Sequence, residues 1–301
     1  MLALAILIAV VLSVASPYFL TTVNILNLLD QSVVVGIVAI GMTFVILTGG
    51  IDLSVGSIAG LTGIVFGLVV PDLGLPVGAL VAMLSGAAIG LVSGLLIGYF
   101  GLAAFVVTLG MMSICRSLCY IVSGGISIST IPESLSDFVY TKVAFIPMNV
   151  LVLLVLYLLA WLYLGYTKGG RTVYAIGSNP EAARIAGLSV VGYSILPYVV
   201  SGALAAVSAL LLAGKILSVD PLAGNLLELD AIAAVVIGGA SLFGGRGSIV
   251  GTLIGVFIMV MIRNGLNLLG VSPFWQGSAI GAIIIAAVLV ERLVSQRGSA
   301  R

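Results

Sequence analysis

Charge is scarce in this sequence. Asp, Glu, Lys and Arg together make up 7% of its 301 residues, against about 25% in ordinary soluble domains. Histidine is absent and the net charge is +1, which argues against a nucleic-acid surface, most metal sites and most acid–base enzymes. Hydrophobic residues fill 61% of the positions. The composition therefore predicts an all-α polytopic membrane protein with no metal site.

Cysteine is almost absent as well. Cys115 and Cys119 lie four positions apart on one expected helix. That spacing suits neither a zinc pair nor a disulfide framework. We expect both side chains to pack in the interior.

Long apolar runs dominate the sequence instead. A spanning helix needs about 20 mostly apolar residues, and this rule predicts about ten spans. They are residues 1–16, 32–49, 53–70, 76–98, 102–123, 147–165, 193–215, 229–241, 248–266 and 275–291. Residues 21–31 are expected to form a short interfacial segment and 124–146 a polar loop. The first run lacks the basic region and cleavage site of a signal peptide, and we expect a polar leader to be missing ahead of it.

The distribution of basic residues predicts the orientation, because Lys and Arg in short loops mark the cytoplasmic side. With ten spans, one side collects Lys168, Arg171, Arg184, Arg246, Arg292, Arg297 and Arg301. The opposite side collects Lys142, Lys215 and most of the acids, including Asp72, Glu133, Asp137 and Asp220. Both termini are therefore expected to be cytoplasmic. An error of one helix would put the basic groups on opposite sides.

The longest polar stretch, residues 168–191, interrupts the apolar runs. Ser178 or Asn179 can cap a helix that begins at Pro180, and Gly187 can end it. A helix of about two turns is marginal alone in water. We therefore expect it to dock on another protein.

Glycine is abundant, at 39 residues. Small residues recur at every fourth position from 78 to 98, which predicts a ridge for close packing against another helix. Residues 44–60 also resemble residues 234–251: an apolar run, paired glycines, a polar tip, then Gly-Ser before a new helix. This echo fits either an internal duplication or convergence on one turn chemistry.

Asp52 has two interpretations. Counting the rise of the preceding span places it near the cytoplasmic interface, where it can cap the next helix with Ser54. The alternative is a role in gating.

Two arginines lie inside expected spans. Arg116 is about 10 Å from the outer end of its helix by the helical rise, and it can either snorkel to the surface or line a wet cavity. Arg263, with Asn264 and Asn267, poses the same choice near the outer face.

The span at 229–241 is too short to cross a bilayer, at about 20 Å. Either the helix begins near Leu222, or it is half-length and begins in a cavity. Both versions put Glu228 and Asp230 against protein or water, as in a permeation route. The alternative is an ion pair with Lys215 and a capped helix start.

Four segments together resemble the monosaccharide permeases of ABC importers, within the larger group that includes branched-chain amino-acid permeases. They are GGIDLSVGS at 49–57, EAARIAGL at 181–188, LELDAIAAVVIGGASLFGGRGSIVGT at 227–252 and NGLNLLGVSPFW at 264–275. The likeness covers nearly the whole chain, in order and with matching spacing.

The resemblance implies a single ten-helix permease domain, 1–301, in the cell inner membrane, with a cytoplasmic coupling loop at 166–192. It implies a second permease copy, identical or not, a cytoplasmic ABC ATPase that carries ATP-Mg, and a periplasmic or surface-tethered sugar-binding protein. This chain itself would bind no cofactor and no nucleic acid. The residues that would couple to the ATPase are Ser178, Asn179, Pro180, Glu181, Ala182, Ala183, Arg184 and Gly187. The Ile195-Leu196-Pro197 that follows lies closer to Gly187 than in the usual pattern.

The chain lacks a Gly-Lys-Ser/Thr phosphate-binding motif, so energy for pumping would have to come from a partner. We expect ATPase closure to push on the helix at Pro180 and to rock the bundle between two states. The rival is a self-sufficient secondary carrier or facilitator that couples ions through its intramembrane acids. A membrane-embedded enzyme ranks third, because no nucleophile–base pair is apparent.

Overall fold

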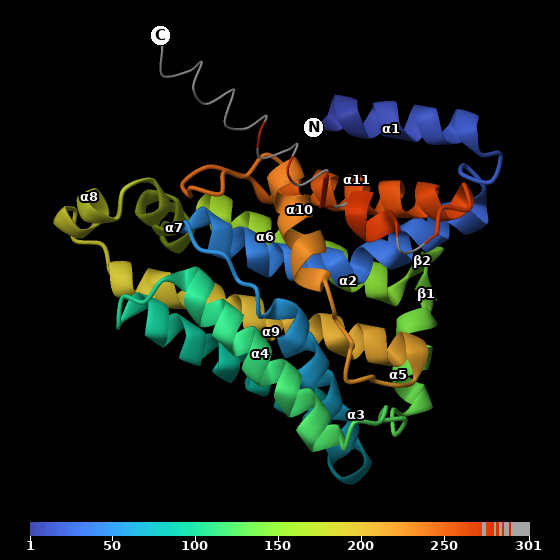
Figure 1. Cartoon of the computed structure of the whole chain (residues 1–301), viewed down its shortest axis with the longest axis horizontal. Coiled ribbons are helices and arrows are strands. Elements are labelled where there is room, and N and C mark those ends of the chain that lie inside the picture. Colours follow the sequence, from blue (N-terminus) through green and yellow to red (C-terminus); the bar gives the residue numbers. More distant parts are fainter. Residues whose placement is uncertain (273–274, 280, 283–284, 286–288, 290–301) are drawn as a thin grey trace.

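The structure, a computed structural model, describes residues 1–272, 275–279, 281–282, 285 and 289 (Figure 1). Its helices are α1 (Leu2–Ala15), α2 (Thr22–Leu47), α3 (Val55–Gly98), α4 (Ala104–Ser123), α5 (Glu133–Tyr140), α6 (Met148–Tyr166), α7 (Lys168–Ser178), α8 (Pro180–Ile185), α9 (Val190–Ile216), α10 (Leu227–Ile237) and α11 (Ile249–Leu268). One short antiparallel hairpin pairs β1 (Lys142–Val143) with β2 (Ile146–Pro147). The expected span at 275–291 lies partly outside the described residues.

Within the described residues, six helices are long and apolar enough to cross a membrane: α2, α3, α4, α6, α9 and α11. One of them, α3, reverses direction at Gly74, which has φ 74° and ψ 168°. The predicted spans 53–70 and 76–98 are therefore its two arms, and the Cβ position of Gly78 lies 3.3 Å from Val70 across the reversal. The chain is an all-α polytopic membrane protein.

The segment at 21–31, expected to be separate from the next span, is continuous with it. Residues 22–31 are the first turns of α2, and Thr21 caps that helix by accepting a hydrogen bond from the Asn24 amide. The polar side chains that suggested an interface bond to other helices instead. Asn24 bonds to Asn264 on α11 and Asp30 to Lys215 on α9, so tertiary contacts stabilise a helix that local composition disfavours.

The two ends of the bundle differ in content. The α8 end carries α7, α8 and the linker 238–248, whereas the α5 end carries α5, the β-hairpin and residues 217–226 (Figure 1). Lys168, Arg171, Arg184 and Arg246 belong to the α8 end; Glu133, Asp137, Lys142, Lys215 and Asp220 belong to the α5 end.

The glycine ridge packs on α9, as predicted. A Cβ at Gly90 would lie 2.1 Å from the carbonyl oxygen of Tyr198, and one at Gly86 would lie 2.3 Å from that of Gly202. Since only hydrogen fits there, the two backbones touch. We call this contact between α3 and α9 the glycine seam.

The two similar segments at 44–60 and 234–251 form similar units. Each is the end of one helix, a glycine turn and the start of the next helix, α2–α3 and α10–α11 respectively. The turns are adjacent, because the Gly245 amide donates to the Leu47 carbonyl at 2.9 Å. Thr43 and Thr252 also share a 2.8 Å hydrogen bond between α2 and α11.

Candidate functional site

The short helix α10 begins inside the bundle. Its 11 residues span about 16 Å, so the half-length alternative is correct and a start near Leu222 is wrong. Before it, residues 217–226 form no regular structure, and Leu217 and Leu226 adopt left-handed backbone conformations at φ 56° and 64°. The helix thus starts from an irregular segment at the α5 end.

Several bonds hold the irregular segment 217–226 in place. Val219 and Ile128 exchange two backbone hydrogen bonds of 2.9 Å. Asp220 accepts from the Leu222 amide at 2.7 Å and from the Ser127 hydroxyl at 2.8 Å. These bonds keep the pKa of the Asp220 carboxyl below its ordinary value.

The first turn of α3 meets the start of α10. A Cβ at Gly56 would lie 2.2 Å from the Gly224 carbonyl oxygen and 2.4 Å from a carboxylate oxygen of Glu228. The linker before α3 is irregular and enclosed, and the Thr108 hydroxyl on α4 donates to the Ile51 carbonyl at 3.1 Å. Irregular backbone is tolerated at membrane depth only with such internal partners.

Asp52, which we expected near the cytoplasmic interface, is enclosed by the protein and 1% exposed. Asp52 is enclosed because the linker between α2 and α3 bonds to α4 through Ile51 and to α9 through Asp52 itself. The predicted contact with Ser54 is present: Oδ1 accepts from the Ser54 amide at 3.0 Å and hydroxyl at 2.5 Å. Oδ2 accepts from the Ser201 hydroxyl at 2.8 Å, which ties the start of α3 to α9.

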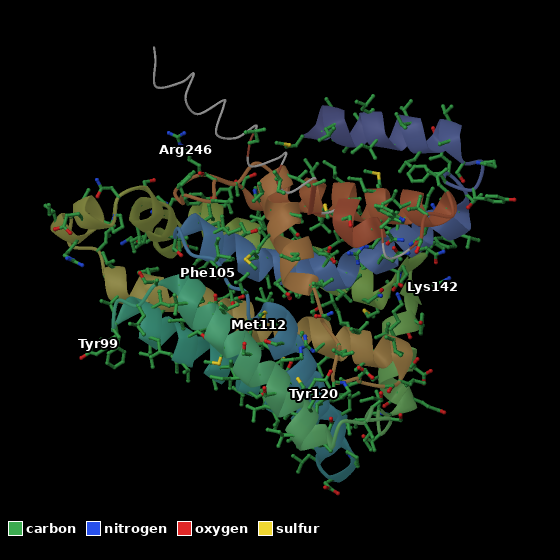
Figure 2. All side chains as sticks on the ribbon, in the orientation of Figure 1. Tyr99, Phe105, Met112, Tyr120, Lys142 and Arg246 are labelled. Atoms are coloured by element: carbon green, nitrogen blue, oxygen red, sulfur yellow. The ribbon has the colours of Figure 1, made fainter. Side chains whose placement is uncertain are left out.

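Arg116 lines a cavity and does not snorkel. Its Nη1 donates to the carbonyl oxygens of Pro221 at 2.7 Å and Ala223 at 3.0 Å. The cavity measures about 400 Å³ and is lined by Met112, Ser113, Arg116, Ser117, Tyr120, Asn225 and Glu228. Figure 2 shows Met112 and Tyr120 along α4. We call it the α4 cavity.

Asp230, near the start of α10, has a different partner from the one considered. Asp230 accepts a 2.7 Å hydrogen bond from Arg263 on α11. The expected ion pair with Lys215 is wrong, because Lys215 pairs with Asp30 on α2. Asn149 on α6 also donates to Asp30, at 2.6 Å.

These two ion pairs line a second cavity, of about 280 Å³, which we call the ion-pair cavity. Its polar lining is Asp30, Gln31, Lys215, Asn225, Asp230 and Arg263. Asn225 lines both this cavity and the α4 cavity. The start of α10 therefore stands between two hollow regions.

The structure places the remaining candidates elsewhere. Asn264 exchanges hydrogen bonds of 2.8 and 3.0 Å with Asn24 and is 5% exposed, so it joins α2 to α11. Asn267 accepts from Gln276 at 2.6 Å, and neither asparagine lines the two cavities.

Sequence reasoning missed Asp30 and Gln31 because it assigned both to an interfacial segment. It considered Lys215 as a marker of orientation and as a partner for the acids of α10, but not as a partner for Asp30. A usable signal was present: all three are polar residues next to long apolar runs, where each needs a partner or water.

The helix α8 forms as predicted. Asn179 accepts from the Ala182 amide at 3.0 Å, Pro180 is the first residue, and Gly187 follows with φ 79°. Glu181 and Arg184 form an exposed pair at 3.4 Å. Ile185 is 82% exposed, which leaves a large apolar side chain uncovered.

The segment before α8 is helical too, which the sequence reading did not predict. α7 begins after Thr167, whose hydroxyl accepts from the Gly170 amide at 3.0 Å. The end of α7 contacts the α2–α3 turn and the α10–α11 turn. A Cβ at Gly177 would lie 1.8 Å from the Leu47 carbonyl oxygen and 2.6 Å from the Gly245 nitrogen.

The geometry defines a class: a multi-pass membrane protein with half-length and re-entrant segments around polar cavities, of the kind found in transporters. Residues 24–288 match the family described as branched-chain amino acid transport system / permease component. The chain belongs to this family.

Individual relatives align over almost the whole chain. It is 42% identical over 299 residues to ribose import permease protein RbsC of Escherichia coli (strain K12), covering 97% of this chain and 92% of that protein. It is 42% identical to the Bacillus subtilis (strain 168) protein of the same name, over 95% and 90% of the two chains. It is 36% identical to the D-allose transport system permease protein AlsC of Escherichia coli (strain K12), over 97% and 90%. No solved structure matches significantly.

Proposed function

We propose that this chain is the transmembrane permease subunit of an ATP-binding cassette importer that moves a monosaccharide into the cell. The observation that carries the proposal is the 42% identity to a ribose import permease over 97% of the chain. Other sugar permeases, for D-allose and for galactose and methyl galactoside, match over at least 92% of the chain. The protein is a transport component and not an enzyme.

The proposal includes ten spans in the inner membrane, with the α8 end and both termini cytoplasmic. Counting the two arms of α3 and the half-length α10 separately, and adding the segment at 275–291, gives ten. The basic residues Lys168, Arg171, Arg184 and Arg246 of the α8 end support this orientation.

In this proposal α8 docks on a separate ATPase that binds ATP-Mg. The exposed Ile185 and the capped, proline-initiated helix support this role, because a docked helix needs an apolar anchor and a fixed conformation. A second permease copy and a sugar-binding protein complete the importer. The α4 cavity and the ion-pair cavity, at Arg116, Glu228, Asp230 and Arg263, form the sugar pathway.

A single substitution tests the coupling role. Ile185→Glu places a charge on the anchor, and we expect loss of most sugar-stimulated ATPase activity when permease, ATPase and sugar-binding protein are reconstituted together. A milder variant, Ile185→Ser, is compared with Val14→Ser as its matched control. Val14 is a similarly exposed apolar residue, 85% exposed on α1, and a serine is used because a glutamate in a membrane helix would itself be disruptive. Normal coupling in both Ile185 variants would remove α8 from the mechanism. Sugar accumulation by the purified chain without any nucleotide would instead favour a secondary carrier.

A further inference from the structure

The ion-pair cavity is balanced in charge. Four charged residues line it, two acids and two bases: Asp30 with Lys215, and Asp230 with Arg263. The carboxylate side chains are 21% and 9% exposed, and the basic ones 32% and 40%. The acids therefore lie deeper than the bases, and the formal charge of the lining sums to zero.

The balance restricts which ligand can enter. An anion or a cation would have to displace one member of a pair or leave a charge uncompensated in a partly buried site, and removing one partner of such a pair is costly. A neutral polyol avoids this cost. Each hydroxyl can donate to a carboxylate and accept from an ammonium or guanidinium group.

The size and the apolar walls fit one sugar ring. A volume of about 280 Å³ lies near the lower limit for small-molecule sites, which is about 300 Å³. Leu212, Met259 and Val260 contribute apolar surface, against which the C–H face of a ring can pack. Gln31 and Asn225 add amide groups that both donate and accept.

We infer that the ion-pair cavity is a binding subsite for one neutral monosaccharide, and that its charge balance excludes sugar phosphates, sugar acids and amino sugars. This inference rests on the proposed function and deepens it. The permease then discriminates by net charge in addition to any selection by the sugar-binding protein.

Protection from labelling tests the subsite directly. The variant Gln31→Cys puts a thiol on the cavity wall, while the native Cys115 and Cys119 are 1% and 0% exposed and are checked in the unsubstituted chain. The full-length chain in lipid nanodiscs is treated with a small water-soluble thiol reagent. Ribose at ten times its dissociation constant slows labelling about tenfold by simple occupancy, and ribose 5-phosphate at the same concentration leaves the rate unchanged. In the control variant Ser134→Cys, on the exposed face of α5, neither compound changes the rate.

Shifting the charge of the cavity sharpens the test. In Gln31→Cys with Asp230→Asn the lining carries a net positive charge, and ribose 5-phosphate now protects the thiol. In Gln31→Cys with Arg263→Gln the lining is negative, and the cationic sugar glucosamine protects instead. Elution as a single species in size-exclusion chromatography identifies the variants that are folded. If a charge variant fails to fold, the experiment with Gln31→Cys alone still tests the subsite.

The failures of the two proposals are distinguishable. Ribose 5-phosphate or inorganic phosphate protecting the unshifted cavity as well as ribose does would overturn the charge filter. Complete absence of protection by ribose, in a chain that still supports ATP-driven sugar import, would overturn the subsite and leave the proposed function standing. Protection by ribose with no import by the assembled complex would support the subsite and count against the importer.

Discussion

The glycine seam and the ion-pair cavity lie on the same helix, α9, yet they are built in opposite ways. In the seam, backbone meets backbone because Gly86, Gly90 and Gly202 leave no side chain between the helices. At the cavity, ion pairs between side chains join α9 to α2 and α10 to α11. The comparison teaches that the glycine seam fixes α9 by steric fit, whereas the contact of α9 with α2 at Lys215 is held by an ion pair that a sugar hydroxyl or water can replace.

The largest expected effect is in the seam. Gly90→Ala puts a Cβ 2.1 Å from the Tyr198 carbonyl oxygen, and overpacking of this kind costs about 3 kcal/mol. We expect a markedly lower thermal midpoint in nanodiscs. The matched control is Gly110→Ala on α4, where no atom lies within 4 Å and alanine gains up to about 1 kcal/mol of helix propensity. Equal midpoints for the two variants would show that the seam is not a steric contact.

The next effect concerns Asp52, which joins the start of α3 to Ser201 beside the seam. Asp52→Ala leaves the buried hydroxyls of Ser54 and Ser201 without this acceptor, at a cost of about 2 kcal/mol. We expect destabilisation in thermal unfolding, with smaller loss for Asp52→Asn, which keeps one acceptor oxygen. Asp72→Ala, at the exposed reversal of α3, should change the midpoint by little. A neutral Asp52→Ala would mean that the carboxylate does not stabilise this contact.

A smaller effect is expected at the cavity. Lys215→Met keeps the aliphatic stem but leaves Asp30 with Asn149 as its one remaining side-chain partner among the described residues. Because both side chains are partly exposed, we expect a loss of about 1 kcal/mol in the free energy of unfolding. Lys142→Met, on the exposed β-hairpin, is the control. A loss as large as that in Gly90→Ala would contradict the distinction between the glycine seam and the ion-pair contact at Lys215.

The smallest effect is a pH dependence at the α5 end. Since the pKa of Asp220 is lowered below 3.8, its hydrogen bonds contribute stability that is present above that pH and is lost as the pH falls through the lowered value. The protection of residues 217–226 against hydrogen exchange, taken relative to the intrinsic exchange rate at each pH, should therefore fall below about pH 4. Asp220→Asn should remove this acid-dependent step while leaving the other backbone bonds of the segment. A step that persists in the variant would have to come from another group.

Periodic and local features of this fold were predictable from the sequence, and contacts between distant residues were not. The ridge of small residues that ends at Gly98 is visible in the sequence as a repeat of every fourth position. The helix cap at Asn179 can be predicted from the residues directly beside it. The length of 229–241 indicated either a half-length helix or a start near Leu222, and the structure decided between them. Burial of Asp52, in contrast, depends on a linker that re-enters the bundle, which no rise per residue reveals.

The helix α7 was missed for a similar reason. Gly169 and Gly170 disfavour a helix start, but a Cβ at Gly170 would lie 2.3 Å from the Tyr163 carbonyl oxygen. The glycines are there because α6 passes close by. Likewise, Lys215 pairs with Asp30 and not with Asp230 because α9 packs on α2. This packing cannot be predicted from the sequence alone.

The contact at Gly177 has a mechanical consequence. The tail of α7 touches the Leu47 carbonyl and the Gly245 amide with no intervening side chain, and those two groups are bonded to each other. A displacement of α8 by even a fraction of an ångström would therefore reach the α2–α3 turn and the α10–α11 turn together. The α2–α3 turn leads directly into Gly56, and the α10–α11 turn follows α10, whose opposite end begins beside Gly224. Because Gly56 and Gly224 are in contact, a displacement on one side of the membrane is transmitted by both routes to the start of α10.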